Sequence, residues 1–278
     1  MIDGLLVVDK PAGWTSHDIV AKCRGIVGQR RIGHSGTLDP DATGVLLVGL
    51  GRVTRLLRFL TDLPKSYTAE VVFGVSTSTL DASGEVVATH DMSLVPDAVA
   101  AAAVGLTGAI EQVPPMVSAV KVGGRRLHEL ARAGIEVERA PRPVTVYRFD
   151  TAPTDDPLVY RIEVDCSSGT YVRTLAADLG AALGGGAHLR NLRRTAIGSF
   201  SEAEAHGLDA LVTLTPAESM RDYPSVVLPA EAVANGKVIE LELGGPTAVL
   251  SAESGELLAV YEPHGAGRAK PAVVVAPQ

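Results

Sequence analysis

The chain has 278 residues, 46% hydrophobic and 21% charged, a composition typical of a globular protein that buries a substantial core. It contains two cysteines, Cys23 and Cys166, which excludes a disulfide framework and a zinc site built from cysteines alone. No apolar run approaches the roughly 18 residues of a membrane helix, and Asp3 precedes the first apolar run without any basic residue. We therefore expect a cytoplasmic protein without a secretory signal.

The first part of the chain predicts one strand and two helices. Leu5–Asp9 is a short apolar run that ends in a Pro-Ala-Gly turn, as a buried strand does. Ser16 is placed to cap a helix that starts near Asp18. A glycine-rich loop over residues 33–44 then leads to a second amphipathic helix around residues 53–60.

The middle of the chain alternates between strand and helix patterns. The expected strands and helices, in chain order, are a strand over 67–75, a hairpin turn over 81–84, helices over 96–106 and 126–133, strands over 144–149 and 159–166, and a helix over 170–183. Because this order lacks a regular strand–helix–strand repeat, it favours an α+β fold over a doubly wound sheet.

The two parts of the chain differ in net charge. The net charge is −7, and residues 200–278 hold 11 acidic but only 4 basic side chains, so residues 1–199 are neutral overall. Short strand patterns over 248–250 and 257–261 follow a capping box at Thr215-Pro216-Ala217-Glu218. We therefore expect a main domain over residues 1–222 and a small β module over residues 223–278.

Basic side chains gather in the neutral part of the chain. The segment 119–143 contains Lys121, Arg125, Arg126, Arg132, Arg139 and Arg142. Such local clusters bind phosphate even when the whole chain is acidic, and a solvated surface explains them equally well. Charge alone leaves both interpretations open.

One stretch, residues 33–46, combines three glycines with one histidine and two aspartates. Asp39 precedes Pro40, which favours an extended backbone and holds its side chain on a stiff turn. An aspartate that only caps the turn is the alternative. The stretch lacks metal-ligand spacing, a P-loop Gly-Lys-Ser/Thr and a Gly-x-Ser-x-Gly elbow, so carboxylate chemistry or a binding loop remains.

Six ordered motifs between residue 5 and about residue 200 resemble the TruB family of bacterial tRNA pseudouridine synthases. They are Lys10-Pro11-x-Gly13 with Thr15-Ser16-His17, Gly33-His34-x-Gly36-x-Leu38-Asp39-Pro40, Lys65-x-Tyr67 with Thr79-x-Asp81-x-x-Gly84, Pro114-Pro115-x-x-Ser118-Ala119-x-Lys121, Cys166-Ser167-x-Gly169-Thr170-Tyr171-x-Arg173, and Gly186-Ala187-His188 with Leu192-Arg193-Arg194-Thr195. Each motif alone is modest, but their order makes the resemblance specific.

The resemblance implies a fold and a reaction. The fold is a pseudouridine-synthase-like α+β fold, with a mixed, largely antiparallel sheet flanked by helices. An RNA-clasping insertion lies at about residues 119–143, and residues 223–278 form a reduced PUA-like module. The reaction isomerises uridine to pseudouridine in the T-loop of tRNA, at position 55, by base flipping and an essential aspartate.

The resemblance also assigns the site residues. Asp39, Tyr67 and Arg173 are implied as catalytic: an essential carboxylate, a tyrosine that stacks on the base, and the cationic partner of the aspartate. The residues implied in substrate binding are His34, Tyr171, Leu192, Lys10, Lys121, Arg125, Arg126 and Arg194. No cofactor and no metal are implied, because the isomerisation changes no oxidation state and needs no external atom.

The expected partner is the T-arm of tRNA, with no membrane and no obligatory protein partner. Two alternatives remain open from the sequence. One keeps the chemistry and changes the target, to a guide-RNA-dependent reaction or to another RNA. The other is an RNA-binding folding helper in which catalysis is secondary, and the intact set of Asp39, Tyr67 and Arg173 disfavours it.

Overall fold

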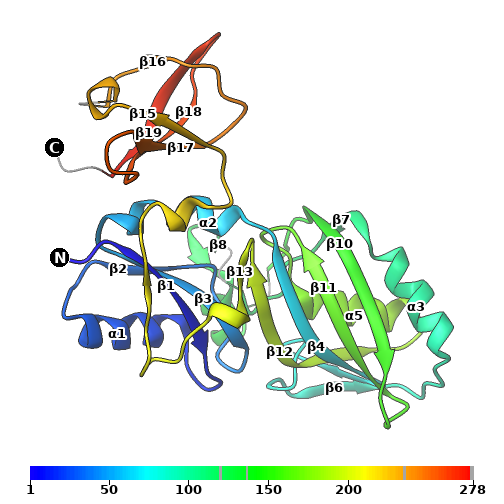
Figure 1. Cartoon of the computed structure of the whole chain (residues 1–278). Helices are drawn as coiled ribbons and strands as arrows, with labels where there is room; N and C mark the ends of the chain where they lie inside the picture. The colour runs from blue at the N-terminus through cyan, green and yellow to red at the C-terminus, as the bar shows by residue number, and fades with distance from the viewer. Residues whose placement is uncertain (119–120, 136, 234–235, 276–278) are drawn as a thin grey trace. The chain divides into compact units, whose positions relative to one another are not determined.

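The computed structural model describes residues 1–118, 121–135, 137–233 and 236–275 (Figure 1). The chain divides into two compact units. Unit 1 consists of residues 1–40, 44–62 and 197–278, and unit 2 consists of residues 41–43 and 63–196.

Unit 1 begins with a small antiparallel group of strands covered by a helix. Strand β1 pairs on one edge with β3 and on the other with β14. The elements in this part of unit 1 are β1 (Gly4–Lys10), α1 (Ser16–Val27), β2 (Ile32–Ser35), β3 (Thr43–Leu50), η1 (Gly51–Arg55), α2 (Leu57–Asp62), β13 (Phe200–Ser201), η2 (Glu202–Glu204), β14 (Thr213–Leu214) and η3 (Glu218–Met220). The apolar face of α1, with Ile19 and Cys23, packs on Leu6 of β1 and Val48 of β3.

Thr15, not Ser16, caps helix α1. The backbone N–H of Asp18 donates to Thr15 Oγ1 at 3.1 Å, and the backbone N–H of Thr15 donates to Asp18 Oδ2 at 2.8 Å, which completes a capping box. Ser16 is buried and bonds to Leu38 instead. The expectation of a Ser16 cap was therefore wrong by one residue, because the reciprocal bond to Asp18 selects Thr15.

The glycine-rich stretch includes most of β2, the start of β3 and the segment between them, which corrects the expectation of a loop between helices. His34 lies within β2, and β2 pairs antiparallel with residues 47–50 of β3. Strand β3 is a continuous apolar run whose residues from Gly44 to Leu50 are all buried. Such a run has no alternation, so periodicity does not identify it as a strand.

Unit 2 contains a five-strand series in the order β12-β4-β11-β10-β7 (Figure 1). Its elements are β4 (Lys65–Phe73), β5 (Val75–Thr77), β6 (Val86–Thr89), α3 (Pro96–Gly105), β7 (Gly108–Gln112), β8 (Lys121–Val122), β9 (Arg125–Arg126), α4 (Leu127–Arg132), β10 (Arg142–Pro153), β11 (Val159–Cys166), α5 (Val172–Ala182) and β12 (Ala187–Ile197). The pairs β4–β11, β11–β10 and β10–β7 are antiparallel. Helix α3 contacts both β10 and α5.

Two strands of unit 2 show why some elements are easier to predict than others. Strand β4 alternates strictly between buried and half-buried residues over its whole length, and the expected strand overlaps it. Strand β12 carries arginines at three positions and a left-handed residue, Asn191, with φ of 54°. Both features break the apolar alternation of a strand, so the sequence analysis did not identify β12.

The last part of unit 1 is a separate five-stranded sheet in the order β15-β17-β18-β19-β16. Its elements are β15 (Ser225–Leu228), η4 (Ala230–Ala232), β16 (Ile239–Glu240), β17 (Thr247–Ser251), β18 (Leu257–Pro263) and β19 (Arg268–Val274). β15 and β17 are parallel and the other pairs are antiparallel. Val249, Leu258 and Tyr261 lie in its core, so the expected small C-terminal β module is present, while the boundary at residue 222 stays a prediction.

Three arginines spaced three residues apart contact this C-terminal sheet. Arg52 donates to the carbonyl of Val275 at 2.5 Å, and Arg55 donates to the carbonyl of Val274 at 2.9 Å. Arg58 pairs with Glu262 at 3.3 Å. These guanidinium groups are therefore used within the protein.

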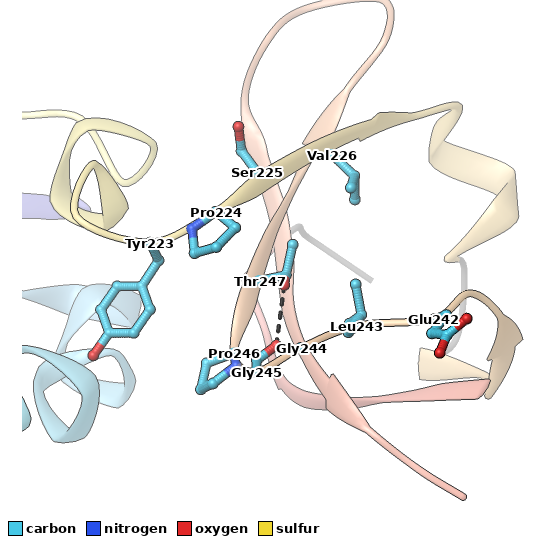
Figure 2. Close-up of a pocket in the computed structure, with 10 residues that line it drawn as sticks. All are labelled: Tyr223, Pro224, Ser225, Val226, Glu242, Leu243, Gly244, Gly245, Pro246 and Thr247. Carbon is cyan, nitrogen blue, oxygen red and sulfur yellow. Dashed lines mark hydrogen bonds between the residues drawn. The ribbon is translucent and has the colours of Figure 1, made fainter. Parts of the chain in front are cut away.

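A cavity of about 400 Å³ opens between the start of β15 and the segment that precedes β17 (Figure 2). Tyr223 lies at its edge and donates its hydroxyl to the carbonyl of Phe59 at 2.8 Å. Among the described residues that line the cavity, Glu242 is the one charged side chain. A wall without a cation is a poor site for the phosphates of RNA.

The architecture confirms an α+β fold with largely antiparallel strands and a small C-terminal β module. Few helices accompany many strands in the described ranges. Of the helices that the structure describes, none combines the length and the apolar character needed to span a bilayer.

Candidate active site

Asp39 lies in the segment between β2 and β3, and both of its chain neighbours are anchored. The backbone N–H of Leu38 donates to Ser16 Oγ at 2.9 Å, and Ser16 Oγ donates back to the carbonyl of Leu38 at 3.2 Å. On the other side, the carbonyl of Pro40 accepts from the ammonium of Lys10 at 2.9 Å and from the backbone N–H of Gly13 at 3.0 Å. The half-buried Asp39 is therefore held on a fixed backbone.

The ammonium of Lys10 is buried among backbone carbonyls. The side chain is fully buried, and its ammonium donates to the carbonyls of Pro11 at 3.0 Å, Trp14 at 2.7 Å and Pro40 at 2.9 Å. An ammonium has three N–H donors, and these three carbonyls accept from it. Lys10 therefore supports the segment that carries Asp39, while its role in substrate binding stays a prediction.

His34 lies on β2 at a half-buried position. Its ring meets the ring of the exposed His17 in an edge-to-face arrangement, with ring centroids 5.2 Å apart. His17 belongs to the first turn of α1, which the Thr15 cap fixes. The chain therefore presents two imidazoles side by side in unit 1, a pair that the sequence analysis did not predict.

In unit 2, Tyr67 and Arg194 form a buried pair. Tyr67 belongs to β4 and is 8% exposed, while Arg194 on the neighbouring strand β12 is 1% exposed. The two side chains share a hydrogen bond. Leu192 is two positions from Arg194 and shares its face of β12. The role of Arg194 in substrate binding stays a prediction.

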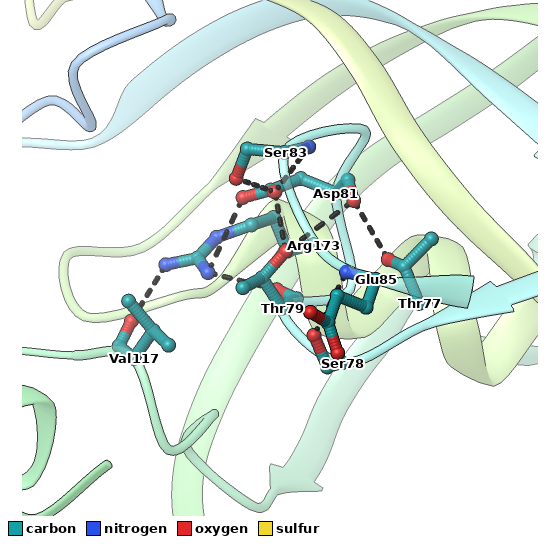
Figure 3. A network of polar contacts seen from close by, with 8 residues as sticks. All are labelled: Thr77, Ser78, Thr79, Asp81, Ser83, Glu85, Val117 and Arg173. Atoms are coloured by element: carbon teal, nitrogen blue, oxygen red, sulfur yellow. Dashed lines mark hydrogen bonds and ion pairs between the residues drawn. The ribbon is translucent and has the colours of Figure 1, made fainter. Parts of the chain in front are cut away.

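Arg173 lies in the first turn of α5 with its guanidinium buried (Figure 3). Nη1 donates to the carbonyl of Thr79 at 2.9 Å, and Nη2 donates to the carbonyl of Val117 at 2.8 Å. Nη1 also lies 3.5 Å from Asp81 Oδ2. Because a helix N-terminus disfavours a cation, these oxygen partners are needed to hold the guanidinium there.

Asp81 is a residue of this site whose role the sequence analysis missed. Its Oδ1 accepts from Thr79 Oγ1 at 2.6 Å, from Ser83 Oγ at 2.6 Å and from the backbone N–H of Ser83 at 3.1 Å (Figure 3). The turn leaves Oδ2 for Arg173. The motif Thr79-x-Asp81-x-x-Gly84 was the available signal, but a motif alone does not identify the partner of a carboxylate.

The same turn is tied to β12. The backbone N–H of Ala82 donates to the carbonyl of Leu189 at 2.9 Å, and the backbone N–H of Leu189 donates to the carbonyl of Leu80 at 3.0 Å. Strand β12 is the strand that carries Leu192 and Arg194. The turn that holds Arg173 through Asp81 is therefore bonded to β12, the strand that carries Arg194, the partner of Tyr67.

Tyr171 is the N-cap residue of α5 and is held by a second buried polar residue, Gln112. The backbone N–H of Tyr171 donates to Gln112 Oε1 at 2.7 Å, and Gln112 Nε2 donates to the carbonyl of Tyr171 at 3.1 Å. This pair of bonds fixes the start of α5 two residues before Arg173. No sequence pattern had indicated Gln112.

The basic insertion is only partly described. Arg125 is exposed at the start of β9, which pairs with β8 as a two-stranded ribbon, and α4 follows directly. The side chains of Lys121 and Arg126 lie outside the part that the structure describes, as do residues 119–120. The roles of Lys121, Arg125 and Arg126 in RNA binding therefore stay predictions.

The described residues contain neither a metal-binding cluster nor a reactive cysteine. Among them, no three His, Cys, Asp or Glu side chains lie close enough together to hold a metal ion. Both cysteines are buried, and burial raises the pKa of Cys166 to about 11. A thiol with that pKa stays protonated at neutral pH and is not a nucleophile.

Two parts of the expected catalytic set belong to different units. Asp39 is in unit 1, whereas Tyr67 and Arg173 are in unit 2. The structure thus brings Tyr67 together with Arg194 of β12, the strand that also carries Leu192. It also brings Arg173 together with Asp81. The pairing of Arg173 with Asp39 stays a prediction.

Comparison with protein families gives two adjacent matches. Residues 24–172 match the N-terminal domain of TruB family pseudouridylate synthases, and residues 173–234 match the C-terminal domain of tRNA pseudouridylate synthase B. The chain is 47% identical to tRNA pseudouridine synthase B of Nocardia farcinica, over 100% of this chain and 94% of that protein. It is 42% identical to the protein of the same name from an Arthrobacter species, over 100% of this chain and 98% of the relative.

Solved structures agree with these matches. A chain of a Cbf5–Nop10–Gar1 complex is 25% identical, with a TM-score of 0.74 over 99% of this chain and 84% of that chain. A chain of an H/ACA RNP bound to a substrate RNA, 23% identical with a TM-score of 0.74, has the same fold over 99% of this chain and 85% of its own length. The chain therefore belongs to the TruB family of pseudouridylate synthases and is an enzyme of that class.

Proposed function

We propose that this enzyme isomerises uridine to pseudouridine in the T-loop of tRNA, at position 55. The observation that carries the proposal is the anchored backbone on both sides of Asp39, at Leu38 and Pro40, in the Gly-His-x-Gly-x-Leu-Asp-Pro stretch that the family match includes. A rigid support keeps a reactive group in its productive position without a cost at the moment of reaction.

The reaction is an internal exchange of bonds. The bond from uracil N1 to the sugar C1′ breaks, the base turns, a bond from C5 to C1′ forms, and the C5 proton is replaced by one at N1. In our proposal Asp39 supplies the essential carboxylate, which splits the exchange into two easier steps. No electron is gained or lost overall, so the proposal requires neither a metal nor a redox cofactor.

The other site residues act on the base. Tyr67 stacks on the flipped uracil, and Leu192 forms an apolar wall of the pocket. Arg173 is the cationic partner of the Asp39 carboxylate. His34 occupies the space that the flipped base leaves, where a stacked ring contributes about 1–3 kcal/mol.

Recognition of tRNA depends on charge in the part of the chain before residue 200. That part holds equal numbers of acidic and basic side chains, and exposed basic ones such as Arg125 attract the phosphates of RNA. We place the enzyme in the cytoplasm, with the T-arm of tRNA as its partner and no protein partner required.

The test compares two substitutions in one loop. Asp39→Asn removes the carboxylate, and Asp41→Asn makes the same change two residues away at an exposed position. Each full-length variant is incubated with unmodified tRNA transcript, and pseudouridine and tRNA affinity are measured. We expect Asp39→Asn to form no product with tRNA affinity retained, and Asp41→Asn to behave as the wild type.

Three outcomes would contradict the proposal. Turnover by Asp39→Asn removes Asp39 as the essential carboxylate. Full wild-type turnover on a transcript with cytidine at position 55, or pseudouridine at other positions, shows that the uridine at position 55 is not the target. Absence of product with tRNA alone, restored by a guide RNA, assigns the enzyme to guided modification instead.

A further inference from the structure

We propose that Arg194 is the positioning residue of Tyr67: its guanidinium holds the phenolic oxygen and thereby fixes the ring on which the substrate base stacks. This inference rests on the proposed function for the role of Tyr67. The hydrogen bond itself, and the burial of both side chains, are independent of that function.

The direction of the hydrogen bond follows from chemistry. A guanidinium carries five N–H donors and has no acceptor, so the oxygen of Tyr67 accepts and Arg194 donates. A bond from a charged donor is about twice as strong as one between neutral groups. The phenolic oxygen is therefore fixed at the end of the ring opposite Cβ, which fixes the position of the long axis of the ring.

The two strands make this contact rigid. Tyr67 lies on the buried face of β4, at the alternate positions that begin with Lys65, and Arg194 lies on β12, the neighbouring strand in the sheet. Strand backbones in the interior of a sheet move little, so a bond between side chains of adjacent strands holds its geometry better than one between loops.

Stability alone does not explain Arg194. Its side chain is 1% exposed and is the largest fully buried side chain among those that the structure describes. Burial lowers the pKa of Arg194, which records the penalty on its charged form, and the contact with Tyr67 opposes this effect. A buried cation is often less stabilising than an apolar residue of similar size, so a role in the site accounts better for its presence.

Burial also excludes the simplest alternative. A phosphate contact requires a side chain that reaches the surface, and a guanidinium with 1% exposure does not. Arg190 on the same strand shows the contrast, because its side chain is 43% exposed and pairs with Glu70 at 2.7 Å. Arg190 therefore provides the matched control for Arg194.

The experiment is a double-mutant cycle on the full-length enzyme. The variants are Arg194→Met, Tyr67→Phe and the double variant, with Arg194→Lys as the conservative replacement and Arg190→Met as the control. For each variant, kcat and KM for tRNA transcript are measured at steady state, and the free energy of unfolding is measured in urea. A misplaced ring costs about 10- to 100-fold in rate.

We expect Arg194→Met to lower kcat by about 10- to 100-fold with KM for tRNA unchanged, and Arg194→Lys to recover most of that loss. In the Tyr67→Phe background, Arg194→Met should cause little further loss, because the acceptor is already absent. Arg190→Met should leave kcat within about twofold of the wild type.

Additive losses in kcat, or no loss for Arg194→Met, would overturn the proposal. Should Arg194→Met not fold, Arg194→Lys and Arg194→Gln complete the cycle, and equal losses in both Tyr67 backgrounds overturn it as well. The same double-mutant cycle, measured on the free energy of unfolding, separates the two proposals. If the wild type shows no turnover on tRNA, the proposed function is refuted. A coupling energy between Arg194 and Tyr67 in unfolding still reports their hydrogen bond in that case.

Discussion

The ion pair of Arg173 with Asp81 gives the sharpest prediction. The substitution Asp81→Asn keeps Oδ1, which accepts from Thr79 and Ser83, and replaces the charged oxygen that faces Arg173. The turn should therefore keep its shape while the guanidinium loses its carboxylate. This isolates the electrostatic part of the contact from its structural part.

The magnitude follows from the geometry. Unit charges 3.5 Å apart interact with about 5 kcal/mol at an effective dielectric constant of about 20. Arg173 keeps its bonds to the carbonyls of Thr79 and Val117, and Asp81 is 22% exposed, so water and these carbonyls replace much of that attraction. We expect a net loss of about 1–3 kcal/mol, shared between unfolding free energy and kcat.

In rate, a loss of 1.4 kcal/mol corresponds to about tenfold. With about half of the loss appearing in the rate, we expect kcat of Asp81→Asn to fall by about 2- to 10-fold in a steady-state assay with tRNA transcript, with little change in tRNA affinity. Urea unfolding measures the stability part. The matched control is Asp150→Asn, which breaks an exposed pair with Arg148 at 3.0 Å and should change stability by about 0.5 kcal/mol or less.

The predicted role of Asp81 is wrong if Asp81→Asn keeps wild-type kcat and stability while Arg173→Lys is inactive. That result means that the two carbonyls alone position the guanidinium. Asp81→Ala adds a second check, because it also removes the acceptor of Thr79 and Ser83. It should destabilise the protein by about 1–2 kcal/mol more than Asp81→Asn does.

Three further predictions address other contacts. Lys10→Met removes the ammonium donor of the Pro11 and Trp14 carbonyls and one of the two donors of the Pro40 carbonyl, which keeps the backbone N–H of Gly13. It should lower the free energy of urea unfolding by about 2–4 kcal/mol, and a loss below about 1 kcal/mol would contradict its role as a buried support. Burial opposes ionisation of Asp3, but the hydrogen bonds from Arg52 outweigh it and hold the pKa of Asp3 below 3.8, so this stabilisation is present above pH 4 and lost as the pH falls through the lowered value. Asp3→Asn should therefore be less stable than the wild type by about 1 kcal/mol at pH 7, with a gap that closes towards pH 2 in urea unfolding; a gap independent of pH contradicts the linkage. Charge reversal at Arg125, alone and together with Arg126, should raise KM for tRNA more than it lowers kcat, with a smaller dependence of binding on salt, and an unchanged KM would remove the insertion from the RNA path.

Local chemistry made several elements predictable from the sequence. Strand β11 was expected at residues 159–166, where it lies, because its apolar residues alternate. The Thr215 capping box forms as expected, with the backbone N–H of Thr215 donating to Glu218 at 2.7 Å, although only one 3-10 turn follows. The family resemblance, built on short motifs, also pointed to the enzyme class that the comparisons confirm.

Elements without periodic apolar residues escaped the sequence analysis. Strand β3 is buried throughout and β12 is rich in arginine, so neither shows alternation. Their strand geometry comes from pairing with partners that lie far away in sequence, such as β1 for β3. Periodicity reports only on an element with one wet and one dry face.

The sequence by itself determined which residue types were available: a carboxylate at 39, a phenol at 67 and guanidinium groups at 173 and 194. Only the tertiary structure decided which charges are buried and what they contact. Lysine and arginine side chains usually lie at the surface, yet the partners of Lys10 and Arg194 are carbonyls and a phenol in the interior. The physical reason is that the environment of a charged group depends on long-range packing, which no local pattern encodes.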